Sequence, residues 1–151
     1  MIKAITSTWF ECFVIVPKVQ DDGNVRNVNE VYTVDALTFT EAETRITDEM
    51  QPYVANMVGG FNIKNINPAQ YKEIFFSEDK KDDRWFKVKV AFITYDEKTS
   101  KEKLSNVLYL VQADKAETAQ SYTNEVMDRG MLDYRIISNV ETKIMDVYQH
   151  E

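Results

Sequence analysis

The feature that most constrains the fold of this chain is an internal repeat. The pair WF at positions 9–10 recurs 76 residues later at 85–86, and VYTVDA at 31–36 recurs 77 residues later as LYLVQA at 108–113. Further on, F-x-I at 61–63 matches Y-x-I at 134–136, and IF at 74–75 matches VY at 147–148, both at an offset of 73. Because the offsets change only where turns and loops are expected, they predict a tandem duplication.

Each copy opens with the alternating pattern of a half-buried β-hairpin. In segment 84–95 the even positions are apolar from Phe86 to Phe92, and in segment 9–16 the same phase runs from Phe10 to Val16. A polar turn follows near 21–24 and near 96–99, and a second strand follows each turn. The residues expected in the core are Phe10, Val14, Tyr32, Val34, Phe86, Val90, Tyr109 and Val111.

A helix is predicted after each hairpin, because both copies carry a capping sequence followed by an apolar stripe at helical spacing. The capping sequences are Thr40–Glu43 and Asp114–Glu117. The chain then returns to extended segments at 61–66 and 71–76, and at 134–140 and 143–148. The predicted fold is therefore α+β, a tandem duplication of a ββαβ(β) module with antiparallel sheets, each covered by one helix.

The expected division of the chain follows from the repeat and from its one dense charge run. Residues 1–76 form the first ββαβ(β) module, the run SEDKKDDR at 77–84 is the charged linker, and residues 85–151 form the second module. At 151 residues, the two modules are expected to form one compact unit.

Composition excludes several classes of protein. The net charge of −7 and the pI near 4.8 disfavour indiscriminate binding to duplex nucleic acid or to an anionic membrane. No segment reaches the roughly 20 apolar residues that a membrane span needs, and the N-terminus lacks an apolar signal-peptide core. The single cysteine, Cys12, cannot form an intramolecular disulfide. We therefore expect a cytoplasmic protein with no membrane partner.

Several segments together resemble the domain-of-unknown-function family DUF 4494. They are IKAITSTWFEC, VDALTFTEAE, YKEIFFS, DDRWFKVKVAFITYDEKTSKEK followed by SNVLYLVQA, and ETKIMDVY, and they span nearly the whole chain. The resemblance implies a bacterial or phage origin. It carries over no activity and no catalytic residue.

The residues favour a protein that is not an enzyme and has neither cofactor nor metal. The only histidine, His150, lies beside the C-terminus with no nucleophile motif nearby, where a frayed tail is the expected structure. Cys12 falls on the core face of its strand, and no glycine-rich phosphate loop is present. Asp79, Asp82 and Asp83 could share a divalent cation, but the basic residues between and beside them neutralise the run.

The two hairpins differ in charge, and this difference provides the only candidate site. Residues 80–103 carry a net charge of +3, whereas residues 9–37 carry −3. In the second hairpin, cations and aromatic rings share the face away from the core, which is typical of a platform for single-stranded nucleic acid. The predicted binding residues are Trp85, Lys87, Lys89, Tyr95, Lys101 and Lys103.

The alternative, which the acidic composition favours, is that both tryptophans are buried between the modules and the lysines only solvate an edge. Three functional hypotheses follow, of which an enzyme with an acidic site has the least support. The first is a non-enzymatic protein that binds single-stranded nucleic acid through the second hairpin. The second is a protein-interaction or oligomerisation module, including a homo-oligomer formed through edge strands, with no nucleic-acid role.

Overall fold

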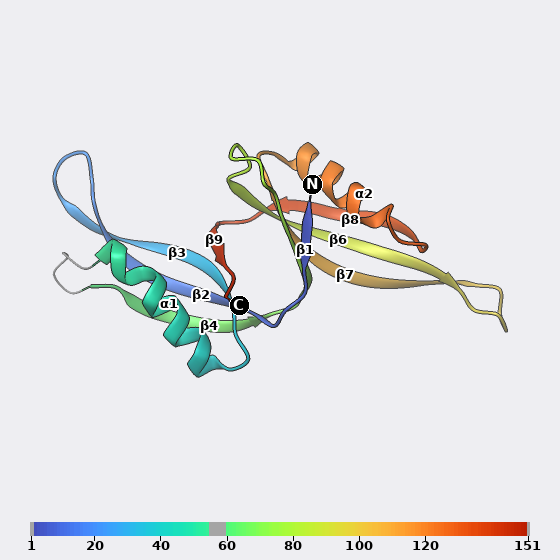
Figure 1. The fold of residues 1–151 in the computed structure, drawn as a ribbon, viewed down its shortest axis with the longest axis horizontal. Helices are drawn as coiled ribbons and strands as arrows, with labels where there is room; N and C mark the ends of the chain where they lie inside the picture. Colours follow the sequence, from blue (N-terminus) through green and yellow to red (C-terminus); the bar gives the residue numbers. More distant parts are fainter. Residues whose placement is uncertain (1, 55–59, 151) are drawn as a thin grey trace. The chain divides into compact units, whose positions relative to one another are not determined.

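The computed structural model describes residues 2–54 and 60–150 and has an α+β fold. The chain divides into two compact units, and each unit is a mixed sheet with one helix packed against it (Figure 1). The five-stranded unit contains residues 1–6 and 70–142, and the four-stranded unit contains residues 7–69 and 143–151. Within the described residues, no helix has the length and apolar character needed to cross a membrane.

The four-stranded unit is built on a long hairpin of β2 (Trp9–Val19) and β3 (Val25–Asp35). Helix α1 (Phe39–Val54) follows and packs on β2, β3 and β4 (Asn62–Ala69). The last strand is β9 (Ile144–Tyr148), which pairs in parallel with β3. The strand order is therefore β4-β2-β3-β9, and β9 forms one edge of the sheet.

The five-stranded unit repeats this arrangement and adds one strand. Its hairpin is β6 (Arg84–Tyr95) and β7 (Glu102–Ala113), followed by α2 (Ala116–Met127) and β8 (Asp133–Glu141). Strand β5 (Tyr71–Phe76) pairs in parallel with β7, and the short β1 (Lys3–Ile5) pairs antiparallel with β5. The strand order is β1-β5-β7-β6-β8.

The registers of the two sheets correspond residue by residue at the offsets seen in the sequence. Strand β2 corresponds to β6 at an offset of 76, β3 to β7 at 77, and β5 to β9 at 73. A register shift also interrupts the β2–β4 and β6–β8 pairings at equivalent positions. This agreement supports the expected duplication. The equivalent pairs include Phe10 with Val34 and Phe86 with Val111 in the hairpins, and Val34 with Tyr148 and Val111 with Phe75 in the parallel pairs.

The units divide the chain differently from the expected modules 1–76 and 85–151. Strand β5 comes from the end of the first repeat but lies in the sheet of the second, and β9 comes from the end of the second repeat but lies in the sheet of the first. Both exchanged strands pair in parallel, so the sheets are mixed and the expectation of purely antiparallel sheets was wrong. Alternation specifies which residues of a strand are buried, but it does not specify the neighbouring strand.

Each unit has its own apolar core between its sheet and its helix. The eight residues expected in the core are all buried, so the predicted phase of the strands is confirmed. Cys12 is also fully buried, as expected for a small apolar side chain on this face.

Both helices begin close to the predicted capping sequences. In α1 the cap is Thr38, whose hydroxyl accepts a hydrogen bond from the N–H of Glu41 at 3.1 Å. The predicted cap was Thr40, two residues too late, because the sequence TFTEAE offers two overlapping capping boxes. In α2, Lys115 occupies the cap position and makes no side-chain cap bond.

The charged segment 77–84 joins β5 to β6, both of which belong to the five-stranded unit. Its Asp82 is only 2% exposed. The Asp82 carboxylate accepts hydrogen bonds from the hydroxyls of Ser77 and Tyr122, the latter at 2.6 Å, and its backbone carbonyl accepts one from Gln112 at 3.0 Å. These contacts hold the middle of the segment against its unit.

Candidate functional site

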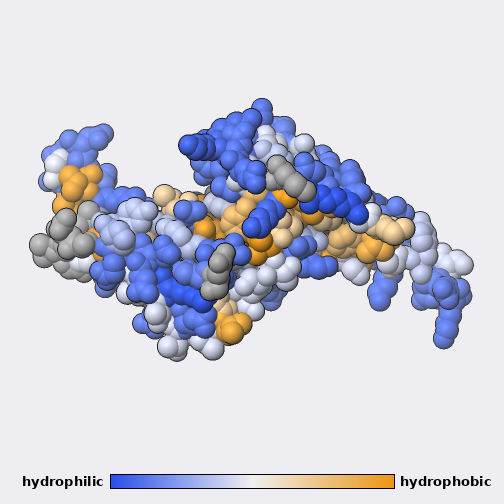
Figure 2. Space-filling view, in the orientation of Figure 1, coloured by the Kyte–Doolittle hydropathy of each residue, from blue (hydrophilic) through white to orange (hydrophobic). Residues whose placement is uncertain are grey.

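Strand β6 places four of the six predicted nucleic-acid-binding residues on one face of the sheet. Phe86 and Val88 belong to the core beneath α2, so the alternate residues Trp85, Lys87, Lys89 and Tyr95 lie on the opposite face. Lys103 does not join them, because it pairs with Thr94, which has the phase of the core face. Lys101 lies in the turn before β7. The tip of this hairpin is hydrophilic (Figure 2).

The predicted stacking role of Trp85 is contradicted by its burial. Its side chain is only 2% exposed, and the Phe76 ring packs against it edge to face at 5.6 Å between centroids. A base cannot stack on a ring whose faces are already covered. Trp9, the equivalent residue in the other repeat, is buried as well.

Three predicted residues remain exposed on this face: Lys87, Lys89 and Tyr95. The ammonium of Lys87 lies 5.9 Å from the centre of the Tyr71 ring, a cation–π distance. Lys89 borders a hollow of about 330 Å³ with Asn106 and Leu108. The face therefore keeps two cations and one accessible ring.

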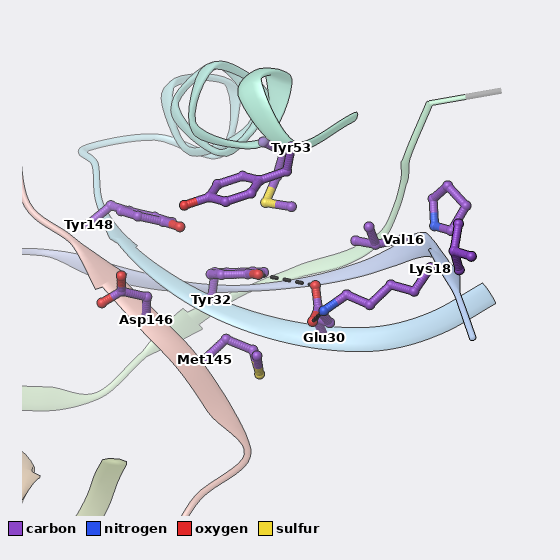
Figure 3. A pocket seen from close by; sticks show the side chains of 11 residues that line it. Val16, Lys18, Glu30, Tyr32, Tyr53, Met145, Asp146 and Tyr148 are labelled. Carbon is purple, nitrogen blue, oxygen red and sulfur yellow. Dashed lines mark hydrogen bonds and ion pairs between the residues drawn. The ribbon is translucent and has the colours of Figure 1, made fainter. Parts of the chain in front are cut away.

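A cavity of about 530 Å³ lies in the four-stranded unit, and the sequence analysis did not anticipate it (Figure 3). Its volume falls in the range of small-ligand pockets. The walls come from the end of β2, the middle of β3, the last turns of α1, and β9. The lining residues are Val16, Pro17, Lys18, Val19, Glu30, Tyr32, Met50, Tyr53, Met145, Asp146 and Tyr148. We call this cavity the tyrosine pocket.

Three tyrosines give the pocket an aromatic wall. Tyr32 and Tyr148 stack with a centroid separation of 5.6 Å and an interplanar angle of 16°. Tyr53 extends from α1 toward Tyr148 (Figure 3) and is 64% exposed. Burial raises the pKa of Tyr32 and of Tyr148 well above the ordinary value, and nearby carboxylates raise both further. The Tyr32 and Tyr148 rings are therefore neutral around pH 7.

One carboxylate is buried in this aromatic setting. The Glu30 side chain is 4% exposed, and its Oε1 accepts a hydrogen bond from the Tyr32 hydroxyl at 3.1 Å. Its Oε2 lies 2.7 Å from the ammonium of Lys18, whose side chain is 45% exposed. A second carboxyl, Asp146, lines the β9 side of the pocket, and its pKa is raised by the loss of surrounding water. The pocket is thus an acidic and aromatic site, and among the described residues that line it the one cation is Lys18 at the rim.

The five-stranded unit shows how this pocket differs from its structural equivalent. At the matching offsets, Val107 stands for Glu30, Thr94 for Lys18, and Phe75 for Tyr148. Phe75 packs on Tyr109 with centroids 4.9 Å apart, and both are fully buried. The five-stranded unit therefore has apolar packing at the position where the four-stranded unit has a cavity with a buried charge.

His150 makes defined contacts instead of lying in the frayed tail expected for it. The backbone N–H of His150 donates to the Asp35 carboxylate at 2.9 Å, and the imidazole lies between Asp35 and Glu49 at 2.9 and 3.2 Å. Burial raises the pKa of the Cys12 thiol to about 12, so Cys12 is a poor nucleophile near neutral pH. In residues 2–54 and 60–150 no group of three or more histidine, cysteine or carboxylate side chains is arranged to hold a metal ion.

The family model described as "Domain of unknown function (DUF4494)" matches residues 8–150, so the chain belongs to this family, as its sequence motifs indicated. A search of curated proteins and a search of solved structures each found no significant match.

Proposed function

We propose that this member of the DUF4494 family is a non-enzymatic binding protein that acts in protein interactions, and that its tyrosine pocket accepts a positively charged group of the partner. The observation that carries the proposal is the Glu30 carboxylate, which is 4% exposed inside an aromatic cavity. A carboxylate so placed loses its hydration and requires a cation in return.

The electrostatics of the pocket favour a cation over an anion or a neutral ligand. The faces of neutral tyrosine rings attract cations, and Glu30 and Asp146 add negative charge on two sides. The whole chain carries a net charge of −7, which raises the rate at which cations arrive. Lys18 satisfies Glu30 from a rim position and is half in water, so an incoming cation can replace it without leaving a buried ammonium behind.

The rim of the pocket favours a protein as the source of that cation. Val19, Tyr53 and Met145 are large, exposed and next to the cavity. Tyrosine and methionine are enriched where proteins contact one another. A lysine or arginine side chain of a partner can place its charge against Glu30 while its neighbours cover this apolar rim.

The test uses a cation without the rest of a partner. Tetramethylammonium and Nα-acetyl-lysine methylamide are titrated into the isotope-labelled protein, and NMR shifts are followed at Glu30, Tyr32 and Tyr148. We expect saturable shifts that are lost in Glu30→Gln and preserved in Glu97→Gln, which removes the same charge from an exposed turn of the five-stranded unit. Binding that is unchanged by Glu30→Gln would refute the proposal.

A second candidate function is the binding of single-stranded nucleic acid through the β6–β7 hairpin. It is favoured by the exposure of Lys87, Lys89 and Tyr95 on one face, although Trp85 is excluded from stacking. Each phosphate contact should give a salt dependence of about −0.7 in log–log slope. Fluorescence anisotropy with oligo(dT) tests it. Exchange of Lys87 and Lys89 for Glu should abolish binding, and the same exchange at the exposed Arg26 and Lys64 should not.

A further inference from the structure

The five-stranded unit contains one strand, β1, that has no counterpart among the described residues of the other unit. Strand β1 pairs antiparallel with β5, with Ala4 opposite Phe75. The preceding residue of the segment, Ile2, is buried in the core. Its N–H donates to Glu125 at 3.2 Å and its carbonyl accepts from Arg129 at 3.5 Å, both near the end of α2. The short segment 2–5 therefore completes both the edge of the sheet and the core of its unit.

In the four-stranded unit the equivalent edge is β9, which corresponds to β5 at the offset of 73. Among the residues that the structure describes, no strand pairs with the outer side of β9. The N–H of Val147 donates instead to the neighbouring Asp146 carboxylate at 2.8 Å. An open edge of this kind is the usual place for an extended peptide to add as a further strand.

The tyrosine pocket occupies the place that corresponds to the site of Ile2. The core that includes Ile2 also contains Phe75, Tyr109 and Met127. At the repeat offsets their equivalents are Tyr148, Tyr32 and Met50, and all three line the pocket. Among the described residues of the four-stranded unit, 7–54, 60–69 and 143–150, no strand corresponds to β1 and no side chain corresponds to that of Ile2.

We propose that the partner supplies an extended segment that adds antiparallel to the outer edge of β9, as β1 does to β5, and that inserts a lysine or arginine side chain into the tyrosine pocket. This inference rests on the proposed function and names the form of its partner. The inserted residue is basic rather than apolar because Glu30 stands where the other unit has Val107. Insertion displaces the Lys18 ammonium from Glu30 to the solvent.

The equivalent register places the added strand opposite residues 147–149, because β1 lies opposite residues 74–76. Its backbone gains hydrogen bonds to the outward-facing groups of β9, and these hold the basic side chain over the pocket. The chain itself provides the template for a probe. Residues 2–7, IKAITS, are synthesised with blocked ends, in the natural form and with Ile2→Lys.

The experiment compares these peptides with Nα-acetyl-lysine methylamide, which carries the same cation without a strand. We expect the Ile2→Lys peptide to bind about tenfold more tightly than the single residue, as two or so added backbone hydrogen bonds would give. Amide hydrogen exchange should slow within residues 147–149 only with the peptide. A scrambled peptide of the same composition controls for the charge of the Ile2→Lys peptide. In the Glu30→Gln protein, the Ile2→Lys peptide should bind no more tightly than the natural peptide.

The outcomes separate the two proposals. If the single cation binds but the peptide binds no more tightly and leaves the β9 amides unprotected, strand addition is refuted and cation binding stands. If the natural peptide binds as well as the Ile2→Lys peptide, the basic side chain is refuted. If neither the cation nor any peptide binds, the tyrosine pocket has no such partner and both proposals fail.

Discussion

Removing the two partners of the Lys18–Glu30 pair one at a time should destabilise the protein unequally. The Glu30 side chain is 4% exposed, whereas the Lys18 side chain is 45% exposed. In Lys18→Met the buried carboxylate keeps only the hydrogen bond from Tyr32 at 3.1 Å. In Glu30→Gln the amide still accepts that bond, and the Lys18 ammonium turns into water.

The expected magnitudes follow from this asymmetry. An uncompensated buried charge costs about 3–5 kcal/mol, and the half-exposed position of Lys18 reduces this to about 2–4 kcal/mol for Lys18→Met. Glu30→Gln loses mainly a partly solvated ion pair, which contributes about 1 kcal/mol or less. With a urea dependence of about 2 kcal/mol per M, the larger loss lowers the unfolding midpoint by about 1–2 M.

Urea unfolding followed by tyrosine fluorescence and by far-UV circular dichroism measures both changes. Lys98→Met is the matched control, since this lysine lies in an exposed turn, and it should change the free energy of unfolding by less than about 0.5 kcal/mol. In the same set, Lys18→Met should bind tetramethylammonium more tightly because the competing ammonium is gone. A loss for Lys18→Met no larger than that for Glu30→Gln would mean that the carboxylate is hydrated, and the reasoning about the tyrosine pocket would be wrong.

Three further predictions concern the rest of the chain. Phe86→Ala should cost about 3–5 kcal/mol in calorimetry, whereas Tyr95→Ala on the exposed face of the same strand should cost about 0.5 kcal/mol or less; equal losses would contradict the described strand phase. Burial raises the pKa of Cys12 to about 12, so its thiolate is scarce at every pH below that value. Iodoacetamide at pH 8 should therefore modify Cys12 in the unfolded chain but not in the native one, as measured by mass spectrometry. Asp82→Asn should cost about 1.5–3 kcal/mol in urea unfolding, because the buried carboxylate accepts a tyrosine hydroxyl at 2.6 Å, while Asp83→Asn at the exposed neighbour should be neutral.

Local elements and burial could be predicted from the sequence because each depends on a short period. The alternation around Phe86 and Val90 predicted the strand and its buried face, and both residues are buried. The matching offsets predicted two similar α+β halves, and the sheets have corresponding registers. The pairing of β5 with β7 and of β9 with β3 could not be predicted, because an apolar strand carries no information about its neighbour.

The tyrosine pocket was missed although the sequence carries a signal for it. Residues 28, 30, 32 and 34 share the core phase of their strand, and the second of them is Glu30. A charge on a core phase is costly, so it indicates a partner or a ligand. The lysine partner cannot be deduced from the hairpin register, because Lys18 lies opposite Arg26 whereas Glu30 lies opposite Val14. The long Lys18 side chain reaches along the sheet to Glu30. The sequence instead favoured a binding site in the second hairpin, because its charges are dense. The density of charge does not indicate whether the Trp85 side chain is exposed.

The exchange of β5 and β9 makes the halves of the gene product interdependent. A cut within 77–84 would separate a first fragment whose sheet lacks β9 from a second whose sheet lacks β5 and β1, although each fragment keeps its own hairpin and helix. Neither fragment should fold alone, and the two should fold on mixing, by complementation.

The same connectivity permits two whole chains at high concentration to exchange these strands with each other and form a domain-swapped dimer. Pairing of segments so far apart along the chain also predicts slow folding, because the entropy of closing long loops is lost before the non-local contacts can stabilise the structure.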